Sequence, residues 1–437
     1  MSEGPSLIRI RRGAWDDDSE LSLSVPSHWL VTELRLAPTR PLSAGEIHAA
    51  LAAPAGGPPV RDLAAGKRHI GVIVDDLTRP TRADELLGPL LSDLAAAGVT
   101  REQLTLFVAC GSHDAPSEGD IAMKVGSSLA GFGHVVVHDC HTQCEHVGTT
   151  RRGTPVSVNA RLLTCDLRIG VGSVFPHPAA AFSGGAKLLA PGMCGAVTIR
   201  HMHDHLRPAR ERGGELACEF RDEMNEIVRM VGLDHVVLAV PGADRRAVAC
   251  IAGTPEDALT RAVTSERQLA TVLIPAPTHV DAIIIDAYPF DSTLQFAHDR
   301  ALWPIKEFPP EVPAVVIARC QRGAGTHEFF PAANPFLERI WRRVRGIRTS
   351  DLRRIPEILR NAVALRAERR REIILMAEGL TGDEVRCVFP HGIVCRTWWE
   401  VCSMIDARLP GVTPRVALFS SAPLLLPQRQ RPDPITS

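Results

Sequence analysis

Short apolar runs that alternate with helix-forming segments are the feature that most restricts how this chain can fold. HIGVIVDD (69–76) and QLTLFVACG (103–111) are apolar runs of strand length, and ADELLGPLLSDLAAAG (83–98) between them has helical apolar spacing and ends at glycine. HVVVHDC (134–140) and DLRIGVGSV (166–174) are two more such runs. Strands that alternate with helices predict an α/β fold, with a mostly parallel sheet flanked by helices.

A second α/β pattern begins at DAIIIDAYP (281–289) and extends to VALFSS (416–421). The chain has 437 residues, more than one ordinary core organises, so two domains of this kind are expected, with an active site in the cleft between them. The predicted division is an N-terminal domain over 1–275, a C-terminal domain over 276–415, and a strand and tail over 416–437 that can return to the first domain.

Two local predictions concern the ends of the first domain. LIRIRR (7–12) and WLVTELRL (29–36) are expected to be strands around an acidic turn at residues 16–18. DALTRAVTSERQLATVLI (257–274) is expected to be one long helix.

Composition excludes several classes of function. A net charge of −1 gives no electrostatic reason to expect a nucleic acid or an acidic membrane as a partner. MSEGPSLIRIRRG has no apolar signal core, and no stretch approaches the roughly 20 apolar residues that a membrane helix needs. Eleven cysteines without a CxxC pair predict reduced thiols in a cytoplasm. The expected partner is therefore a small molecule, and the oligomeric state stays open.

The polar segment DDLTRPTR (75–82) directly follows the first apolar run of the sheet. Ligands of open α/β sheets bind at the carboxyl ends of strands. Thr78 and Arg79 can hydrogen-bond an anion there, and Asp76 can cap the next turn or bind a ribose hydroxyl. The alternative is a structural strand-to-helix turn with an aspartate cap.

CGSHDAPSEGD (110–120) follows the next strand and places His113 behind a Gly-Ser turn. A histidine on a strand-end loop is a better acid/base candidate than one on an apolar face. A loop histidine without a chemical role is the alternative.

The segment 175–205, FPHPAAAFSGGAKLLAPGMCGAVTIRHMHDH, contains the other candidates. His177 follows a strand, and Gly184 and Gly185 allow a close approach of the backbone to a ligand. Lys187 is one of only four lysines in the chain, and an amine, unlike a guanidinium, can be deprotonated and react. The glycine spacing does not match a nucleotide triphosphate loop.

Three weaker patterns remain open. His201, His203 and His205 alternate, so that His201 and His205 share a face if the segment is helical, and any of them can reach a metal in a turn. HDCHTQCEH (138–146) lacks the second cysteine pair of a zinc site. The arginines of 342–371 form either a solvated helix face or a patch for phosphate or a partner.

Taken together, DDLTRP, CGSH, GTTRRGTPVSVN and FPHPAAAFSGGAK with the histidines downstream resemble the nickel-pincer lactate racemase family. His177 and Lys187 are ten residues apart, and Lys187 and His203 are sixteen apart, as in the family pattern. The motifs match the family strongly over about residues 65–210. In the rest of the chain only the expected architecture is similar.

This resemblance implies a racemase or epimerase of a 2-hydroxy acid that works by reversible hydride transfer to a nickel-pincer nucleotide, nickel pyridine-3,5-bisthiocarboxylic acid mononucleotide. By analogy, Lys187 forms the covalent link to this nucleotide and His203 ligates nickel. His113 and His177 act as the acid/base pair on opposite sides of the substrate carbon. The residues that would hold the nucleotide are Asp76, Thr78, Arg79, Gly184 and Gly185.

The chain departs from the family pattern on the substrate side. Family racemases have Y-P-x-D followed by an aromatic–Gln pair and a lysine for the substrate carboxylate. In YPFDSTLQFAHDRAL (288–302), Tyr288 and Gln295 match, but no lysine follows, so His298 or Arg300 would have to bind the carboxylate. Asp114 also replaces an arginine beside His113. These differences imply a substrate other than lactate.

Two other functions remain compatible with the motifs. The chain can be an enzyme that uses the same nucleotide for another hydride transfer, or a homologue that binds the nucleotide without racemase activity.

Overall fold

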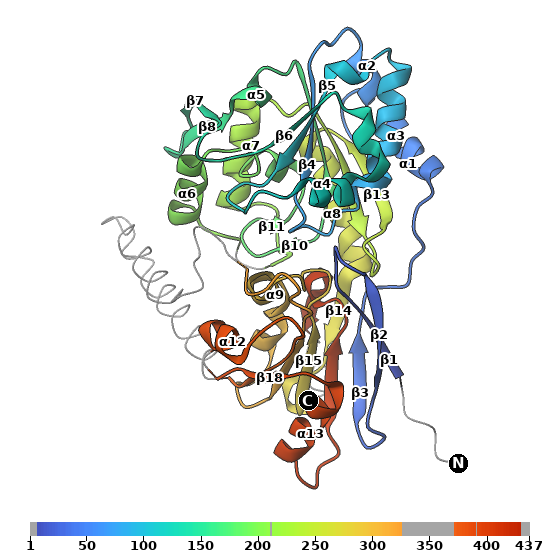
Figure 1. Ribbon diagram of the computed structural model, residues 1–437, viewed down its shortest axis with the longest axis vertical. Helices are drawn as coiled ribbons and strands as arrows, with labels where there is room; N and C mark the ends of the chain where they lie inside the picture. Colours follow the sequence, from blue (N-terminus) through green and yellow to red (C-terminus); the bar gives the residue numbers. More distant parts are fainter. Residues whose placement is uncertain (1–6, 210–211, 326–370, 390, 430–437) are drawn as a thin grey trace, which may run out of the picture. The chain divides into compact units, whose positions relative to one another are not determined.

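The computed structural model describes residues 7–209, 212–325, 371–389 and 391–429 (Figure 1). The chain divides into two compact units. We call Pro38–Leu269 the central unit, and Met1–Ala37 together with Ala270–Ser437 the composite unit. Residues 1–37, which the sequence assigned to the first domain, therefore cluster with the C-terminal half of the chain.

The central unit contains a six-stranded sheet in the order β13-β12-β9-β4-β5-β6. All neighbouring pairs are parallel except β12 and β13, as the buried apolar runs predicted. The strands are β4 Ile70–Asp75, β5 Leu104–Ala109, β6 His134–Val137, β9 Leu167–Ser173, β12 His235–Pro241 and β13 Ala247–Gly253.

Helices cover both faces of this sheet. Residues of α1, α2, α3 and α4 share one apolar core with alternate residues of the strands. On the opposite face, the α5 side chain Leu162 packs close to Gly71 of β4, and Leu188 of the short η3 turn packs against β9. The helical segments are α1 Ala44–Ala52, α2 Val60–Ala64, α3 Ala83–Ala96, α4 Glu118–Val125, α5 Ala160–Leu163, η3 Gly185–Leu188, α6 Ala196–His205, α7 Glu219–Val231 and α8 Pro255–Ala270.

The strand order creates a switch point beside β4. After β4 the chain continues to β5 and β6 on one side, and it then returns to the other side of β4 with β9. The loops that leave the carboxyl ends of β4 and β9 therefore diverge, which is where open α/β sheets bind ligands. Two small antiparallel pairs adjoin this edge: β7 Cys144–Thr149 with β8 Pro155–Asn159, and β10 Pro176–His177 with β11 Ala181–Phe182.

The composite unit contains a second six-stranded sheet, in the order β18-β17-β16-β15-β19-β3, in which every pair is parallel. Its strands are β3 Leu30–Leu34, β15 Ala282–Asp286, β16 Ala314–Ile317, β17 Ile373–Met376, β18 Ile393–Cys395 and β19 Arg415–Phe419. The α-helices described in this unit are α9 Leu294–Ala301, α12 Gly382–Val388 and α13 Trp398–Arg408.

Two sequence predictions differ from the structure here. The acidic turn leads from β1 Leu7–Arg12 into an additional strand, β2 Ser19–Ser24, because the SELSLS alternation pairs with β1. The predicted long helix stops with α8, and its last residues form β14 Thr271–Ile274, which pairs with β20 Leu426–Arg429. Residues 415–419 form β19 inside the composite sheet, between β15 and β3. Of the arginine-rich segment 342–371, only Arg371 lies within the described residues, where it is buried and donates to the carbonyls of Phe308 and Pro309.

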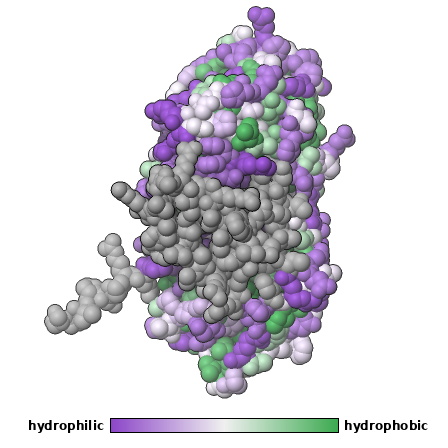
Figure 2. All heavy atoms as spheres, turned by 90° about the vertical axis from the view of Figure 1, so that its left-hand side faces the viewer, coloured by the Kyte–Doolittle hydropathy of each residue, from purple (hydrophilic) through white to green (hydrophobic). Residues whose placement is uncertain are grey.

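The face of the molecule drawn in Figure 2 is largely polar among the described residues. On the face drawn in Figure 2, hydrophilic residues cover most of the coloured surface and apolar residues are scattered among them. Within the described parts of the chain, no helix is both long and apolar enough to cross a membrane.

Stability should depend on pH through His235 at the start of β12. Its ring is buried, Nε2 has no hydrogen-bond partner among the described residues, and burial lowers the pKa of His235 from 6.5 to about 4. As the pH falls, the unfolded chain therefore protonates His235 before the folded chain does. The folded state keeps its full stability with respect to this histidine above pH 6.5 and loses stability as the pH falls toward 4. We expect His235 to reduce the free energy of unfolding by about 2 kcal/mol between pH 7 and pH 5. Urea unfolding of wild type and His235→Leu at both pH values measures this difference, and equal pH dependence in the two proteins would contradict it.

Candidate active site

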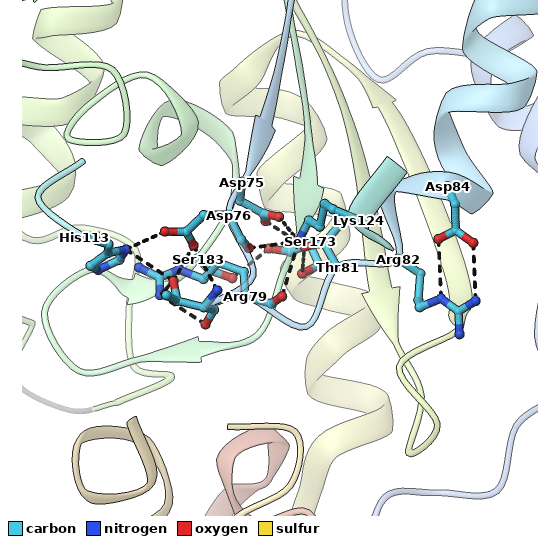
Figure 3. A network of polar contacts seen from close by, with 11 residues as sticks. Asp75, Asp76, Arg79, Thr81, Arg82, Asp84, His113, Lys124, Ser173 and Ser183 are labelled. Carbon is cyan, nitrogen blue, oxygen red and sulfur yellow. Dashed lines mark hydrogen bonds and ion pairs between the residues drawn. The ribbon is translucent and has the colours of Figure 1, made fainter. Parts of the chain in front are cut away.

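Asp76 and His113 meet above the carboxyl ends of β4 and β5 (Figure 3). Asp76 Oδ2 lies 2.7 Å from His113 Nδ1, and Asp76 Oδ1 accepts a hydrogen bond from the Thr78 amide at 3.0 Å and another from the Thr78 hydroxyl. Arg79 folds back onto Thr78, with Nη1 2.8 Å from its hydroxyl. Asp76 thus caps the turn that follows it, one of the two roles predicted for it, and its bond to His113 is a contact that the sequence did not predict.

The protonation of this pair follows from its surroundings. Burial alone would raise the pKa of Asp76, but His113, Arg79 and Thr78 together hold that pKa well below its usual range. Burial lowers the pKa of His113 more than the Asp76 carboxylate raises it, and the charges of Arg79 and Lys187 lower it further. At neutral pH His113 is therefore a neutral imidazole that donates Nδ1–H to Asp76 and carries its lone pair on Nε2.

His177 is held in the opposite tautomer. It lies buried in β10, where its Nδ1 accepts hydrogen bonds from the amides of Ala179 at 3.1 Å and Ala180 at 3.2 Å. A ring nitrogen that accepts from two N–H groups carries no proton, so the neutral ring has its hydrogen on Nε2. The two predicted acid/base histidines therefore differ: His113 presents a base and His177 presents a donor.

The Lys187 charge lowers the pKa of both His113 and His203, so it acts electrostatically on both rings. Lys187 extends from η3 behind Gly184. His203 is in α6, where Nδ1 donates to the Ile199 carbonyl at 2.7 Å and the ring packs edge-to-face on Phe220 at 5.4 Å. A histidine whose Nδ1–H is bound to a carbonyl presents Nε2 to a metal, the usual arrangement of a metal-bound imidazole.

Gly184 and Gly185 have a structural reason to be glycine. Both have positive φ, +77° and +59°. A Cβ on Gly184 would lie 3.0 Å from the Val174 side chain, and one on Gly185 would lie 3.0 Å from the Pro255 carbonyl oxygen. The turn that carries Lys187 thus needs glycine for its conformation and its packing on the protein. Contact of these glycines with a nucleotide stays a prediction.

Lys124 anchors the loop that carries Asp76 (Figure 3). Its buried ammonium forms an ion pair with Asp75 Oδ1 at 2.5 Å and donates to the carbonyls of Asp76 at 3.0 Å and Arg79 at 3.2 Å. Asp75 Oδ2 also accepts from Thr81 at 2.6 Å. This cation fixes both ends of the turn that orients His113.

A second buried cation holds the loop that connects His177 to Lys187. The Arg221 guanidinium, on α7, donates to the carbonyls of Gly184 and Ala180, each at 3.2 Å, and to that of Phe182. Because Arg221 is only 3% exposed, these carbonyls replace water around its charge.

The surroundings of the predicted nickel ligand, His203, bear on how a metal could be held. Across the described residues, no group of three or more His, Cys, Asp or Glu side chains is arranged to hold a metal ion. In the 138–146 segment, His138 is buried and its Nε2 lies 2.9 Å from the Cys194 carbonyl, which gives this histidine a structural role.

Known proteins resemble part of this chain in sequence. Residues 17–213 match the lactate racemase N-terminal domain. Over this region the chain is similar to the lactate racemase family. It is 27% identical over 250 residues to the lactate racemase of Thermoanaerobacterium thermosaccharolyticum, covering 56% of this chain and 58% of that protein. It is 25% identical over 210 residues to the lactate racemase of Lactiplantibacillus plantarum, covering 47% of this chain and 49% of that one. The matches thus span about half the length of these relatives.

Solved structures extend the likeness to the whole fold. The lactate racemase apoprotein from T. thermosaccharolyticum superposes with a TM-score of 0.74 at 19% identity, covering 97% of this chain and 100% of that one. A structural-genomics protein from Thermotoga maritima gives a TM-score of 0.60 at 16% identity, covering 90% and 100%. The two-unit α/β architecture is therefore shared with the lactate racemase fold.

The substrate-side candidates lie outside the matched family domain, in the composite unit. Tyr288 is fully buried and its hydroxyl donates to Asp18 Oδ1 at 2.7 Å. Gln295 donates its amide to Asp299 Oδ2 at 2.8 Å, and His298 Nδ1 lies 3.0 Å from Asp299 Oδ1. The structure thus brings Gln295 and His298 together on α9 around one carboxylate, with Arg300 on the same helix, and it gives Tyr288 a packing role.

The sequence missed three residues of this arrangement: Lys124, Arg221 and Asp299. A weak signal existed for Lys124, because lysine is scarce in the chain and Asp75, the first acid of DDLTRP, ends a buried strand and needs a buried cation. Arg221 and Asp299 stand in helices whose polar residues read as solvent-facing, and no sequence signal distinguishes them.

Removing the Lys124 cation should strongly destabilise the central unit. Lys124→Met keeps the length of the side chain but leaves the Asp75 carboxylate buried without its ion-pair partner. Breaking a buried pair in this way costs about 3–5 kcal/mol. Urea unfolding measures the loss, and Asp75→Asn/Lys124→Met should recover part of it because no charge is left unpaired. A single variant as stable as wild type would contradict the ion-pair account.

Proposed function

We propose that this protein is a racemase or epimerase of a small 2-hydroxy acid. The observation that carries the proposal is the opposite hydrogen bonding of two histidines: Asp76 binds Nδ1 of His113 at 2.7 Å, and the Ala179 and Ala180 amides donate to Nδ1 of His177. The family relationship of residues 17–213 supports it, since the named relatives are lactate racemases. The proposal has two parts: the protein is an isomerase of hydroxy acids, and it uses a nickel-pincer nucleotide as its cofactor.

The side chains fit such a nucleotide. Lys187 is an amine on a glycine-shaped turn and would form the covalent link. His203 would ligate nickel through Nε2, because its Nδ1–H is held by the Ile199 carbonyl. When bound, the nickel-pincer nucleotide supplies a hydride acceptor for the substrate carbon. A single protein histidine suffices if the nucleotide provides the other metal ligands, which suits a site without a larger ligand cluster.

His113 would act as the base on the substrate hydroxyl. Its Nε2 lone pair is available at neutral pH because burial lowers the pKa of the ring, and Asp76 fixes Nδ1–H and thereby the tautomer. A neutral base near the working pH is the efficient choice for taking a hydroxyl proton. The positive charge that forms on the ring is then stabilised by the ionised Asp76 carboxylate.

His177 would act as the donor. In its neutral form Nε2–H can donate to the substrate oxygen, while the Ala179 and Ala180 amides keep Nδ1 as an acceptor. A hydrogen bond to this oxygen stabilises the charge that develops there. In this proposal, His113 is the base and His177 is the hydrogen-bond donor of the predicted histidine pair.

The substrate would contact α9 of the composite unit through Gln295, His298 or Arg300. With the Gln295 amide and the His298 Nδ1 directed at Asp299, Gln295 presents its carbonyl oxygen and His298 its Nε2. An amide oxygen accepts a hydrogen bond, which suits a hydroxyl group better than a carboxylate. A hydroxy acid larger than lactate, with a further hydroxyl, is the proposed substrate class.

Chiral chromatography tests the proposal. Holoprotein made together with the cofactor-building enzymes is incubated with single enantiomers of a panel of 2-hydroxy acids, including sugar acids. The proposal expects inversion at C2 of at least one member. Formation of a keto acid without inversion would indicate another hydride-transfer reaction, and a nucleotide-loaded protein inactive on the whole panel would indicate a binding homologue; either result overturns the racemase proposal.

A further inference from the structure

The histidine run at the end of α6 divides between two faces of the helix. His203 faces Phe220 and the Lys187 side. His201 and His205 lie one turn apart on a different face, with their rings stacked at a centroid separation of 4.3 Å and an interplanar angle of 13°. We propose that His201 and His205 form a second metal site on the outside of α6, for a late first-row divalent ion such as Ni²⁺, Cu²⁺ or Zn²⁺.

Hydrogen bonds orient both rings for this role. His205 Nδ1 lies 3.2 Å from the His201 carbonyl oxygen, and it donates to that oxygen because a carbonyl can only accept. His201 Nδ1 lies 3.1 Å from the hydroxyl of Thr154, itself fully buried between β7 and β8. Such bonds leave Nε2 as the metal-binding nitrogen of each ring and fix its direction, as they do around metal-bound histidines generally.

The separation of the rings suits chelation. Metal–nitrogen bonds of about 2.0–2.1 Å place two imidazole nitrogens on one ion roughly 3 Å apart. Rings already stacked at 4.3 Å need only a small rotation to reach that separation. His205 is exposed and His201 is partly so, which leaves room for this rotation and for water to complete the coordination.

The ligand chemistry selects the ion. Two neutral imidazoles favour Cu²⁺, Ni²⁺ and Zn²⁺ over Mg²⁺ or Ca²⁺, which prefer oxygen ligands. With only two protein ligands the ion would exchange readily. The site is independent of the proposed function, because its residues are not those assigned to the nucleotide or to the chemistry.

Calorimetric titration of the full-length, nucleotide-free protein with Ni²⁺ tests this inference. Wild type and His203→Ala should each bind about one ion at the pair. His201→Ala and His205→Ala should each weaken this binding by about tenfold or more, since each removes half of the protein ligands. His146→Ala, which removes an exposed histidine on β7, is the matched control and should bind as wild type does.

Three results would overturn the proposal: no Ni²⁺ binding by wild type, unchanged binding by His201→Ala and His205→Ala, or loss of binding only in His203→Ala. A second measurement covers the case of a variant that folds poorly. The electron paramagnetic resonance spectrum of wild type with one equivalent of Cu²⁺ should show nitrogen couplings that disappear in His205→Asn; a spectrum with oxygen ligands alone would exclude the pair.

Discussion

Replacing Lys187 with alanine is expected to abolish covalent attachment of the nucleotide. Intact-mass spectrometry of wild type made with the cofactor-building enzymes should show a protein heavier by one nucleotide, and Lys187→Ala should have only the mass of its polypeptide. The reason is chemical: a thioamide link needs a nucleophilic amine, and alanine has none. Lys187→Arg should also remain unmodified although it retains the positive charge, because a guanidinium is a poor nucleophile.

The other lysines provide the controls. Lys124 cannot replace Lys187, because its ammonium is buried and bound to Asp75 and two carbonyls. Lys67→Ala, which changes a partly exposed lysine at a distant part of the central unit, should leave the added mass intact. A nucleotide still attached to Lys187→Ala would place the link on another residue and overturn the assignment of the site.

The two acid/base histidines should respond differently to the same substitution. His113→Gln removes the lone pair that takes the hydroxyl proton, so kcat/KM should fall by a factor of about 10²–10⁴. His177→Gln keeps an N–H donor in a side chain of similar length, so its loss should be at most about tenfold, the equivalent of one neutral hydrogen bond. The racemisation rates of both variants and wild type measure this contrast.

Intact mass serves as the control for these variants, because equal nucleotide loading separates a loss of chemistry from a loss of cofactor. Equal rates for the two variants would contradict the assignment of opposite tautomers. A larger loss in His177→Gln would reverse the assigned roles of base and donor.

The sequence predicted the sheet of the central unit well because its strands are apolar on both faces. β4, β5, β9 and β12 are almost entirely buried, and such runs have few other structures open to them. β2 was missed because SELSLS alternates serine with leucine on an exposed hairpin. The residues after Ala270 were assigned to a helix because TVLI continues its apolar pattern, and pairing with β20 is a long-range contact that the local pattern does not contain.

The members of the candidate site stay a prediction, and their contacts could not be predicted. The resemblance to the racemase family selected His113, His177, Lys187 and His203, and the Lys187 charge acts on the rings of His113 and His203. The bond between Asp76 and His113 joins loops from two different strands, so its partners follow from the strand order and not from local sequence. The hydrogen bonds of His177 to the Ala179 and Ala180 amides depend on the turn after β10, which likewise appears only in the folded chain.

The most direct test of hydride transfer is the fate of the hydrogen at C2. A single enantiomer of the identified substrate, deuterated at C2, is converted by the nucleotide-loaded protein in ordinary water, and the product enantiomer is analysed by mass spectrometry and proton NMR. The account predicts that the product keeps deuterium at C2, because the hydrogen leaves as hydride and returns to the same carbon. Complete exchange of the C2 deuterium for solvent hydrogen would show removal of a proton and would contradict it.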